Sequence, residues 1–282
     1  MSSFLYFILP ALGGYTLTSL YLLKNPLILH KRKRTAFYST HISHRGGCGE
    51  RIESTMEAFT HAVEQGTQMI ELDCHLTQDG HVVVSHDENL LRQTGHDVSI
   101  SSLKLQDLPL YKERLEVTFY AGRYSSGADR KFALLEDLFR KFPEMPVSIE
   151  IKENNKQLIE KNGSMPFSFT VNRGVLLLLL FYSGLLPFVP LGESLLQFYL
   201  PRIINRTFIP EKRILRNKMV ISLLEKVTMR KSLFKHLAAR GIQVHLFVCN
   251  EDEDIKAAIE VGATGVMTDY PTLLSNYLRS HD

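Results

Sequence analysis

The sequence predicts an α/β protein built on a mostly parallel β-sheet and preceded by an N-terminal transmembrane helix. Runs in which apolar and polar residues alternate, as in β-strands, are separated by runs with the spacing of an amphipathic helix. Strands that alternate with helices in this way are typical of a parallel sheet. Polar residues recur where the predicted strands end, at His44, Asp73, Glu150, Asn250 and Asp269. That edge of the sheet is where a (β/α) barrel builds its active site.

The transmembrane helix is predicted over residues 1–24. Met1 to Leu23 contains no charged residue and is long enough to cross a bilayer. No positive residue precedes the apolar run, as a cleavable signal peptide would require, whereas Lys24 and the basic cluster 31–34 follow it. The positive-inside rule then places a basic linker over 25–40, and the remainder of the chain, in the cytosol. A buried N-terminal helix is the alternative.

Composition limits the possible functions. The 282 residues are enough for one large α/β domain or two small ones, and we expect one domain over 41–282. The net charge of +3 is too small to predict a nucleic-acid partner. The three cysteines, Cys48, Cys74 and Cys249, lack the spacing of metal ligands and fit reduced thiols.

The first half of this domain begins with the run 41–47, which predicts a strand that leads into a tight loop and ends at two glycines. Ser54 to Glu57 is a capping-box pattern, which predicts a helix with Ser54 at its N-cap and Gly66 at its C-terminal end. A strand follows at 69–76. Asp79-Gly80 then predicts a hairpin turn into a strand at 81–87.

The second half continues the alternation. The predicted elements are a helix at 134–142, a strand at 147–152, a candidate strand at 167–172, a strand at 243–250, a helix at 252–261 and a final strand at 265–271. Residues 174–192 form a second charge-free stretch. Since the strands before and after it must join one sheet, we expect an interfacial or re-entrant segment that contacts the membrane. A buried helix is the alternative.

The strand at 69–76 carries the first candidate site. Alternation places Glu71, Asp73 and His75 on one face. Two carboxylates that close repel each other, and turning both inward also costs desolvation. A divalent cation bound through oxygen would offset both costs. The alternative is a solvent-exposed face of an antiparallel strand.

A series of short motifs runs along the chain, in the order His44-Arg45-Gly46, Glu53 with Thr55 to Phe59, Glu71-Leu72-Asp73, Ser85-His86-Asp87, Glu150-Ile151-Lys152, Val248-Cys249-Asn250 and Thr268 to Pro271. Together these motifs, which occur in the family's order, resemble the glycerophosphodiester phosphodiesterase family, and within it the membrane-bound mammalian subgroup of lysophospholipase D type. The resemblance implies a TIM-type (β/α) barrel and a metal-dependent phosphodiesterase.

The resemblance also implies the roles of individual residues. Glu71, Asp73 and Glu150 would be ligands of Mg²⁺ or Ca²⁺, which prefer oxygen donors. Arg45 and Lys152 would bind the phosphate oxygens. His44 and His86 would form the acid/base pair, in an order that stays open, and His86 is also a candidate metal ligand. A structural pairing of Arg45 with Glu53 is the alternative for that arginine.

The function implied is hydrolysis of lysophospholipids, such as lysophosphatidylcholine to lysophosphatidic acid and choline. The anchor favours an acylated substrate over the alternative of a soluble glycerophosphodiester, which would give glycerol 3-phosphate. The implied location is the endoplasmic reticulum and perinuclear membrane, with the catalytic domain in the cytosol.

The chain departs from the family in length. Only about a dozen residues separate Lys152 from the candidate strand at 167–172, too few for a helix-strand-helix crossover. We therefore expect a shortened barrel that lacks one strand-helix unit and cannot close with its normal shear. An inactive membrane-bound lipid-binding protein is the corresponding alternative function.

Overall fold

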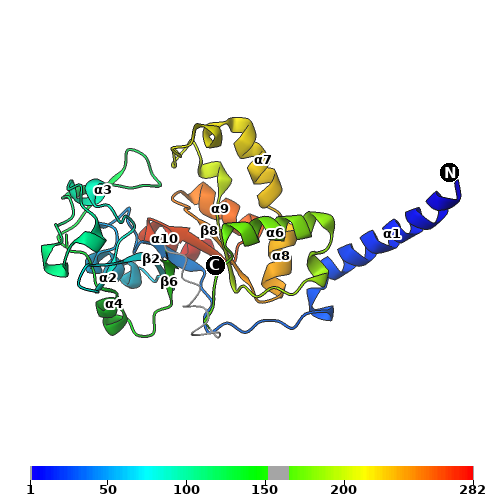
Figure 1. The fold of residues 1–282 in the computed structure, drawn as a ribbon, viewed down its shortest axis with the longest axis horizontal. Coiled ribbons are helices and arrows are strands. Elements are labelled where there is room, and N and C mark those ends of the chain that lie inside the picture. The colour runs from blue at the N-terminus through cyan, green and yellow to red at the C-terminus, as the bar shows by residue number, and fades with distance from the viewer. Residues whose placement is uncertain (1, 152–164, 282) are drawn as a thin grey trace.

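The computed structural model describes residues 2–151 and 165–281, and a single curved β-sheet forms its centre (Figure 1). Six of its seven strands run parallel, in the order β6-β2-β1-β9-β8-β7. These strands are β6 (Val147–Ile151), β2 (Met69–Leu76), β1 (His41–His44), β9 (Gly265–Thr268), β8 (Gln243–Phe247) and β7 (Leu195–Tyr199). The seventh strand, β3 (Val82–Val84), pairs antiparallel with the end of β2. The predicted hairpin at Asp79-Gly80 is therefore confirmed.

Helices cover the outer face of this sheet. The main ones are α2 (Met56–Glu64), α4 (Leu135–Lys141), α8 (Lys231–Ala239), α9 (Asp252–Val261) and α10 (Pro271–His281). On β2, Ile70 and Leu72 pack outward against Phe59 of α2 and Leu138 of α4. Because side chains alternate along a strand, Glu71 and Asp73 lie on the opposite, concave face.

The remaining elements connect this layer or lie at its edges. They are α3 (Leu91–Thr94), the hairpin of β4 (Arg114–Glu116) and β5 (Tyr124–Ser126), α6 (Val171–Ser183), α7 (Lys218–Thr228) and six short 3-10 helices, at Pro26–Ile28, Ile100–Ser102, Leu105–Asp107, Leu186–Phe188, Pro201–Ile203 and Arg213–Arg216.

The sheet curls into a barrel-type fold but stays open on one side. Beyond β7, Ser168 forms a parallel bridge to Leu195, which extends the sheet by one short segment. Within the residues that the structure describes, no strand pairing joins this segment to β6. Across the opening, Gln197 of β7 donates a hydrogen bond to Ser148 Oγ of β6 at 3.2 Å. The opening lies where the sequence predicts a missing strand-helix unit.

Helix α1 (Ser2–Lys24) projects away from the globular part (Figure 1). Its segment Tyr6–Lys24 is long and apolar enough to cross a membrane, and only 6% of it is buried. It contacts the body near its C-terminal end, where Tyr15 and Ser19 donate hydrogen bonds to the carbonyl oxygens of Ser183 and Gly184, both at 2.6 Å. The N-terminal helix predicted from the sequence is thus present, and it could serve as a membrane anchor.

The charge-free stretch 174–192 consists mainly of α6 and the 3-10 helix at Leu186–Phe188. Leu177 and Leu186 pack into the core, whereas Val175 and Leu179 on the other side are exposed. At 1.5 Å per residue, a helix of 13 residues is about 20 Å long, shorter than the hydrocarbon core of a bilayer. The segment is a helix with one buried and one exposed apolar face.

Two local predictions were wrong. The N-cap of α2 is Thr55, whose Oγ1 accepts a hydrogen bond from the Ala58 amide, and not Ser54, whose φ of 59° lies in the left-handed region. The candidate strand at 167–172 shrinks to the bridge at Ser168, because Thr170 caps α6 and the helix begins at Val171.

Candidate active site

Three carboxylates meet on the concave face of the sheet. Glu71 and Asp73 come from β2, and Glu150 comes from the adjacent β6, where it lies directly opposite Asp73 in the register. One oxygen from each of the three lies within 4.8 Å of the others. Glu71 and Asp73 are buried, whereas Glu150 is exposed because β6 borders the opening of the sheet. The structure therefore brings together the three carboxylates that the sequence predicts as metal ligands.

The electrostatics of this cluster favour a bound cation. Burial and the neighbouring Asp73 carboxylate raise the pKa of Glu71 to about 7, although His44 opposes the shift. An all-oxygen donor set with this excess of negative charge matches the preference of hard divalent cations. The residues present thus fit the divalent metal that the resemblance to the family implies.

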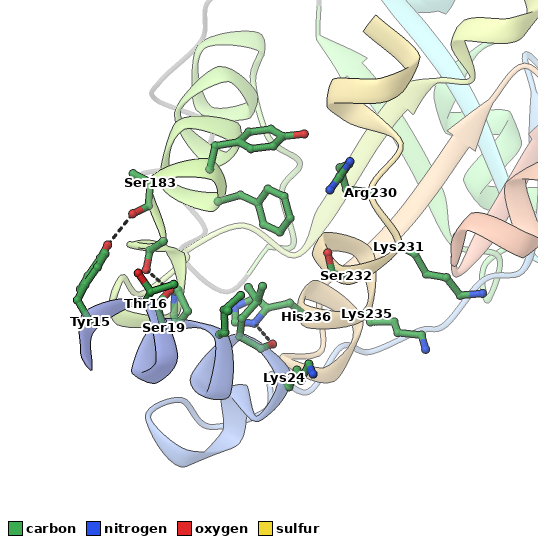
Figure 2. A pocket seen from close by; sticks show the side chains of 16 residues that line it. Tyr15, Thr16, Ser19, Lys24, Ser183, Arg230, Lys231, Ser232, Lys235 and His236 are labelled. Atoms are coloured by element: carbon green, nitrogen blue, oxygen red, sulfur yellow. Dashed lines mark hydrogen bonds between the residues drawn. The ribbon is translucent and has the colours of Figure 1, made fainter. Parts of the chain in front are cut away.

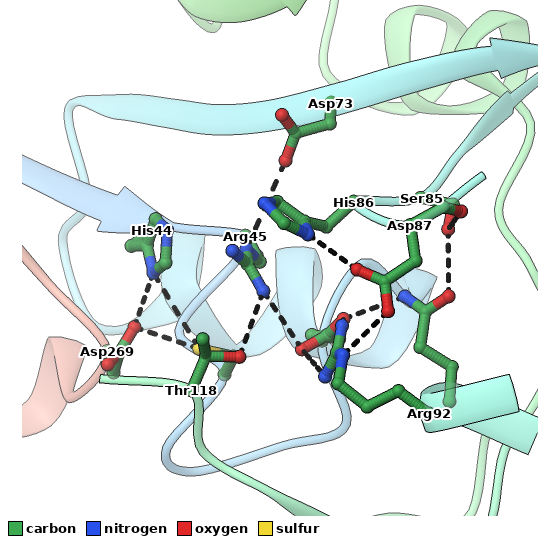
Figure 3. A network of polar contacts seen from close by, with 12 residues as sticks. His44, Arg45, Asp73, Ser85, His86, Asp87, Arg92, Thr118 and Asp269 are labelled. Atoms are coloured by element: carbon green, nitrogen blue, oxygen red, sulfur yellow. Dashed lines mark hydrogen bonds and ion pairs between the residues drawn. The ribbon is translucent and has the colours of Figure 1, made fainter. Parts of the chain in front are cut away.

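His44 ends β1 beside the cluster and is held by Asp269, which follows β9. His44 Nδ1 lies 2.6 Å from Asp269 Oδ1 (Figure 3), and its Nε2 lies 3.9 Å from Glu71 Oε2. Burial lowers the pKa of His44, but the Asp269 and Glu71 carboxylates together outweigh burial, so the pKa is raised overall. Asp269 thus orients the imidazole so that Nε2 faces the carboxylates.

Asp269 is itself fixed by several donors. Asn250 donates to Asp269 Oδ2 at 2.7 Å, and the Cys48 thiol donates to Oδ1 at 2.8 Å. Burial raises the pKa of Cys48 well above its ordinary value, so the sulfur stays a protonated donor. Although His44, Cys48 and Asp269 lie close enough to hold a metal, a thiol in this state is a poor ligand. The sequence places Asn250 and Asp269 at the active-site edge of the sheet and within motifs of the family, but it does not predict their contact with each other or with His44.

Arg45 is buried and paired, which was the alternative expected from the sequence. Its Nη1 lies 3.3 Å from Glu53 Oε2, and its Nε lies 4.0 Å from Asp73 Oδ2 (Figure 3). Its backbone amide donates to Glu71 Oε2 at 3.1 Å, with φ at 49°. The loop after β1 thus places both the amide and the guanidinium of Arg45 at the edge of the carboxylate cluster.

Glu53 forms the centre of a second polar network. It accepts hydrogen bonds from Arg45, from Arg92 at 2.6 Å and from Gln93 at 2.7 Å. Burial raises the pKa of Glu53, but the two arginines outweigh burial and hold it at about 2. Glu53 therefore stays ionised and anchors Arg45.

His86 lies beyond β3 and is partly exposed. Its Nδ1 is 2.6 Å from Asp87 Oδ1, and Asp87 is held in turn by Arg92 at 2.7 Å. In the described part of the chain, the close group of ligand atoms contains Glu71, Asp73 and Glu150 but not His86. The Asp87 carboxylate orients His86 in the same way as Asp269 orients His44. Lys152, the second predicted phosphate ligand, lies outside the described residues.

An aromatic wall borders His44. It consists of Phe119, Tyr199, Phe208 and Phe247. Phe119 meets the His44 ring edge-on with centroids 5.3 Å apart and stacks on Phe208 at 4.6 Å. Tyr199 contacts Phe119, Phe208 and Phe247 at centroid distances from 4.5 to 6.1 Å. Because its members are distant in sequence, the wall was not predicted.

The fold and this site place the chain among the phosphoric diester hydrolases built on a (β/α) barrel. The model of the glycerophosphoryl diester phosphodiesterase family matches residues 44–176, a range that contains all the residues of the carboxylate cluster and both histidines. The chain belongs to this family, whose members generally depend on a divalent metal.

Two human relatives match the chain over nearly its whole length. The chain is 44% identical to the human protein named lysophospholipase D GDPD3, with 100% of this chain and 98% of the relative covered. It is 45% identical to human lysophospholipase D GDPD1, with 98% and 97% covered. The first alignment extends over 311 positions, whereas the chain has 282 residues, so the relative has residues without a counterpart here. The difference approaches one strand-helix unit, which takes roughly 30 residues in a barrel of typical size.

Solved structures confirm the fold. A glycerophosphodiester phosphodiesterase from Thermotoga maritima is similar with a TM-score of 0.56 at 21% identity, over 86% of this chain and 99% of that one. An Oleispira antarctica phosphodiesterase is similar with a TM-score of 0.51 at 19% identity, over 86% and 97%.

Proposed function

We propose that this chain is a membrane-anchored lysophospholipase D that hydrolyses lysophospholipids to lysophosphatidic acid and the free head-group alcohol. The observation that carries the proposal is the close approach of Glu71, Asp73 and Glu150 beside His44 and Arg45. The relatives that match nearly the whole chain at 44% and 45% identity bear this name.

In the proposed mechanism, Glu71, Asp73 and Glu150 hold Mg²⁺ or Ca²⁺. When bound, the cation would attract the phosphate oxygens and stabilise the negative charge that develops on them in the transition state. Arg45 adds a second fixed positive charge at the edge of the cluster, where Glu53 and Asp73 hold it. Lys152 is proposed for the same role.

Two histidines are available for proton transfer. His44 Nε2 faces the carboxylates, while Nδ1 is held by Asp269. His86 is partly exposed and is held by Asp87. We assign one to accept the proton of the attacking hydroxyl or water, and the other to protonate the leaving alcohol. Each carboxylate partner stabilises the charged imidazolium that forms on its histidine.

The apolar surfaces of α1 and α6 are the reason that we propose an acylated substrate. Helix α1 would anchor the chain in the endoplasmic reticulum and perinuclear membrane, with the globular part in the cytosol. The exposed apolar face of α6 would rest on the same leaflet. A lysophospholipid resides in or near that leaflet, whereas a soluble glycerophosphodiester does not.

The test is choline release from lysophosphatidylcholine by the purified full chain, with Mg²⁺ or Ca²⁺ added. Glu71→Gln should abolish release, whereas Glu136→Gln, a charge-matched change on the exposed face of α4, should leave it unchanged. Equal activity of wild type and Glu71→Gln would refute the site. Faster turnover of glycerophosphocholine than of lysophosphatidylcholine would instead favour the soluble substrate.

The opening between β6 and Ser168 supports a second candidate, a lipid-binding protein without turnover. Glu150 is on the strand that borders this opening, where the described residues form no strand pairing on the side away from β2. Restoring the residues of human lysophospholipase D GDPD3 that have no counterpart in this chain separates the two functions. Lipid binding without turnover that becomes turnover upon insertion would favour the binding protein, whereas equal turnover in both chains would favour the enzyme.

A further inference from the structure

A cavity outside the candidate active site lies where α1 meets α6 and α8 (Figure 2). Its volume is about 750 Å³, within the range of small-molecule sites. Leu20, Leu23, Phe181 and Pro187 give it an apolar part. We call it the anchor pocket, because one of its walls is the segment of α1 from Tyr15 to Lys24.

The polar part of the anchor pocket is strongly basic. Lys24, Arg230, Lys231 and Lys235 line it, and none of its lining residues is an Asp or a Glu. Among the described residues, none of these four cations is in an ion pair. Arg230 lies over the ring of Tyr182 at 5.9 Å, which holds its guanidinium at the pocket. A cavity with four unneutralised cations attracts an anion.

The start of α8 adds to this attraction. Arg230, Lys231 and Ser232 all line the pocket, and they occupy the N-cap and first two positions of α8. No side chain caps this end of the helix. The amides of a first helical turn and the positive end of the helix dipole therefore reinforce the basic side chains as a phosphate site.

The opposite wall offers no competing anion. Tyr15 and Ser19 of α1 bond to the carbonyl oxygens of Ser183 and Gly184, which end α6. These contacts satisfy the C-terminal carbonyls and join α1 to the body. Figure 2 shows the lysines and Arg230 on the side of α8 and at the end of α1, across from Tyr15 and Ser183.

We propose that the anchor pocket binds one anionic phospholipid of the bilayer, with its phosphate at the start of α8 and its acyl chains along the apolar part. Basic clusters beside a membrane helix attract anionic lipids, and a cavity makes the contact specific to one molecule. The inference rests on the proposed membrane placement of α1. It assigns a structural ligand that is separate from the substrate at the carboxylate cluster.

The absence of tryptophan from the chain allows a direct test. In Tyr182→Trp, the single tryptophan replaces a pocket-lining ring and keeps an aromatic face for Arg230. The protein is reconstituted in phosphatidylcholine nanodiscs that contain a small fraction of brominated lipid, whose bromine quenches a nearby tryptophan. Brominated phosphatidylserine should quench at a mole fraction at least about tenfold lower than brominated phosphatidylcholine.

Charge-reversed variants provide the controls. Lys231→Glu/Lys235→Glu, added to the reporter chain, should abolish the preference for phosphatidylserine. Lys104→Glu/Lys112→Glu makes the same change in net charge at exposed positions outside the pocket and should leave the preference intact. Equal quenching by the two lipids, or an equal loss in both double variants, would overturn the proposal.

Two further measurements distinguish a site for free phosphate from a lipid site, and a wrong placement of α1 from a wrong lipid site. Millimolar inorganic phosphate should not relieve the quenching, and full relief would identify a site for free phosphate instead of a lipid. Incorporation of the full chain into nanodiscs of phosphatidylcholine alone tests the placement of α1, and failure there would overturn that placement and the lipid site with it. Choline release is measured separately, so loss of lysophospholipase activity alone leaves the lipid result standing.

Discussion

Asp269 Oδ1 lies 2.6 Å from His44 Nδ1, although 225 positions separate the two residues in sequence. β1 and β9 are parallel neighbours in the sheet, so the residues at and just beyond their carboxyl ends meet. Asp269 fixes the ring of His44 and leaves Nε2 directed at the carboxylate cluster. Asp269 is therefore a positioning residue, since it acts through His44.

Asp269→Asn should lower kcat for choline release by about 10²- to 10⁴-fold, the usual contribution of general acid/base catalysis, and change KM little. The pH profile should shift toward lower pH, because Asp269 is the main group that raises the pKa of His44. The matched control is Asp254→Asn, another buried aspartate, which lies on α9, pairs with Arg206 and should keep wild-type kcat. An equal loss in both variants would reduce the role of Asp269 to general stability.

Metal binding should stabilise the folded chain. Without a cation, the buried carboxylates of Glu71 and Asp73 repel each other, so the melting temperature should rise on addition of Mg²⁺ or Ca²⁺. Glu71→Gln removes part of the repulsion and a ligand together. This variant should therefore melt above the metal-free wild type, and its melting temperature should not respond to metal. A full metal response in Glu71→Gln would contradict the assignment of the cluster.

Glu53→Gln should destabilise the fold by about 3 kcal/mol, because it leaves Arg45 as a buried charge without its main partner. Urea unfolding measures the change. Glu136→Gln, which breaks an exposed pair with Arg140, should cost less than about 0.5 kcal/mol. Equal midpoints for the two variants would show that Glu53 contributes no more than a surface glutamate.

Acid should weaken the packing of α8 against α1. Burial is the main cause that lowers the pKa of His236 to about 4, and its Nδ1 donates to the Leu23 carbonyl at 2.9 Å. The unfolded chain then binds more protons than the folded chain between pH 6.5 and 4, so stability falls as the pH falls through that window. At pH 5 the loss from this residue should be about 2 kcal/mol.

His236→Asn tests this effect, because its side-chain amide can donate to the same carbonyl and does not titrate. The measurement is the difference in melting temperature between pH 7.5 and pH 5.0, for wild type and variant. The difference should be smaller in His236→Asn, because one titrating group is lost. It should not vanish, since His41 and His245, whose pKa values are also lowered, remain in both chains. An unchanged difference would assign the acid sensitivity to other groups.

The sequence by itself determined which residues share a face within each strand. Alternation set Glu71 and Asp73 on one side of β2 and Glu150 on one side of β6, and the structure agrees. This succeeds because the direction of a side chain along a strand depends on local backbone geometry. Local patterns also located the helix at 252–261 with its correct bounds, whereas the opening was expected from the length of the chain compared with the family that it resembles.

Only the tertiary structure decided which distant groups meet. The contact of Asp269 with His44, the pairing of Arg45 with Glu53 and the aromatic wall around Phe119 all depend on strand order and loop paths. Even the N-cap of α2 depended on the loop, since the left-handed backbone at Ser54 leaves Thr55 to accept the amide hydrogen bond. Spacing along the chain encodes faces, whereas contacts between distant elements arise from packing of the whole sheet.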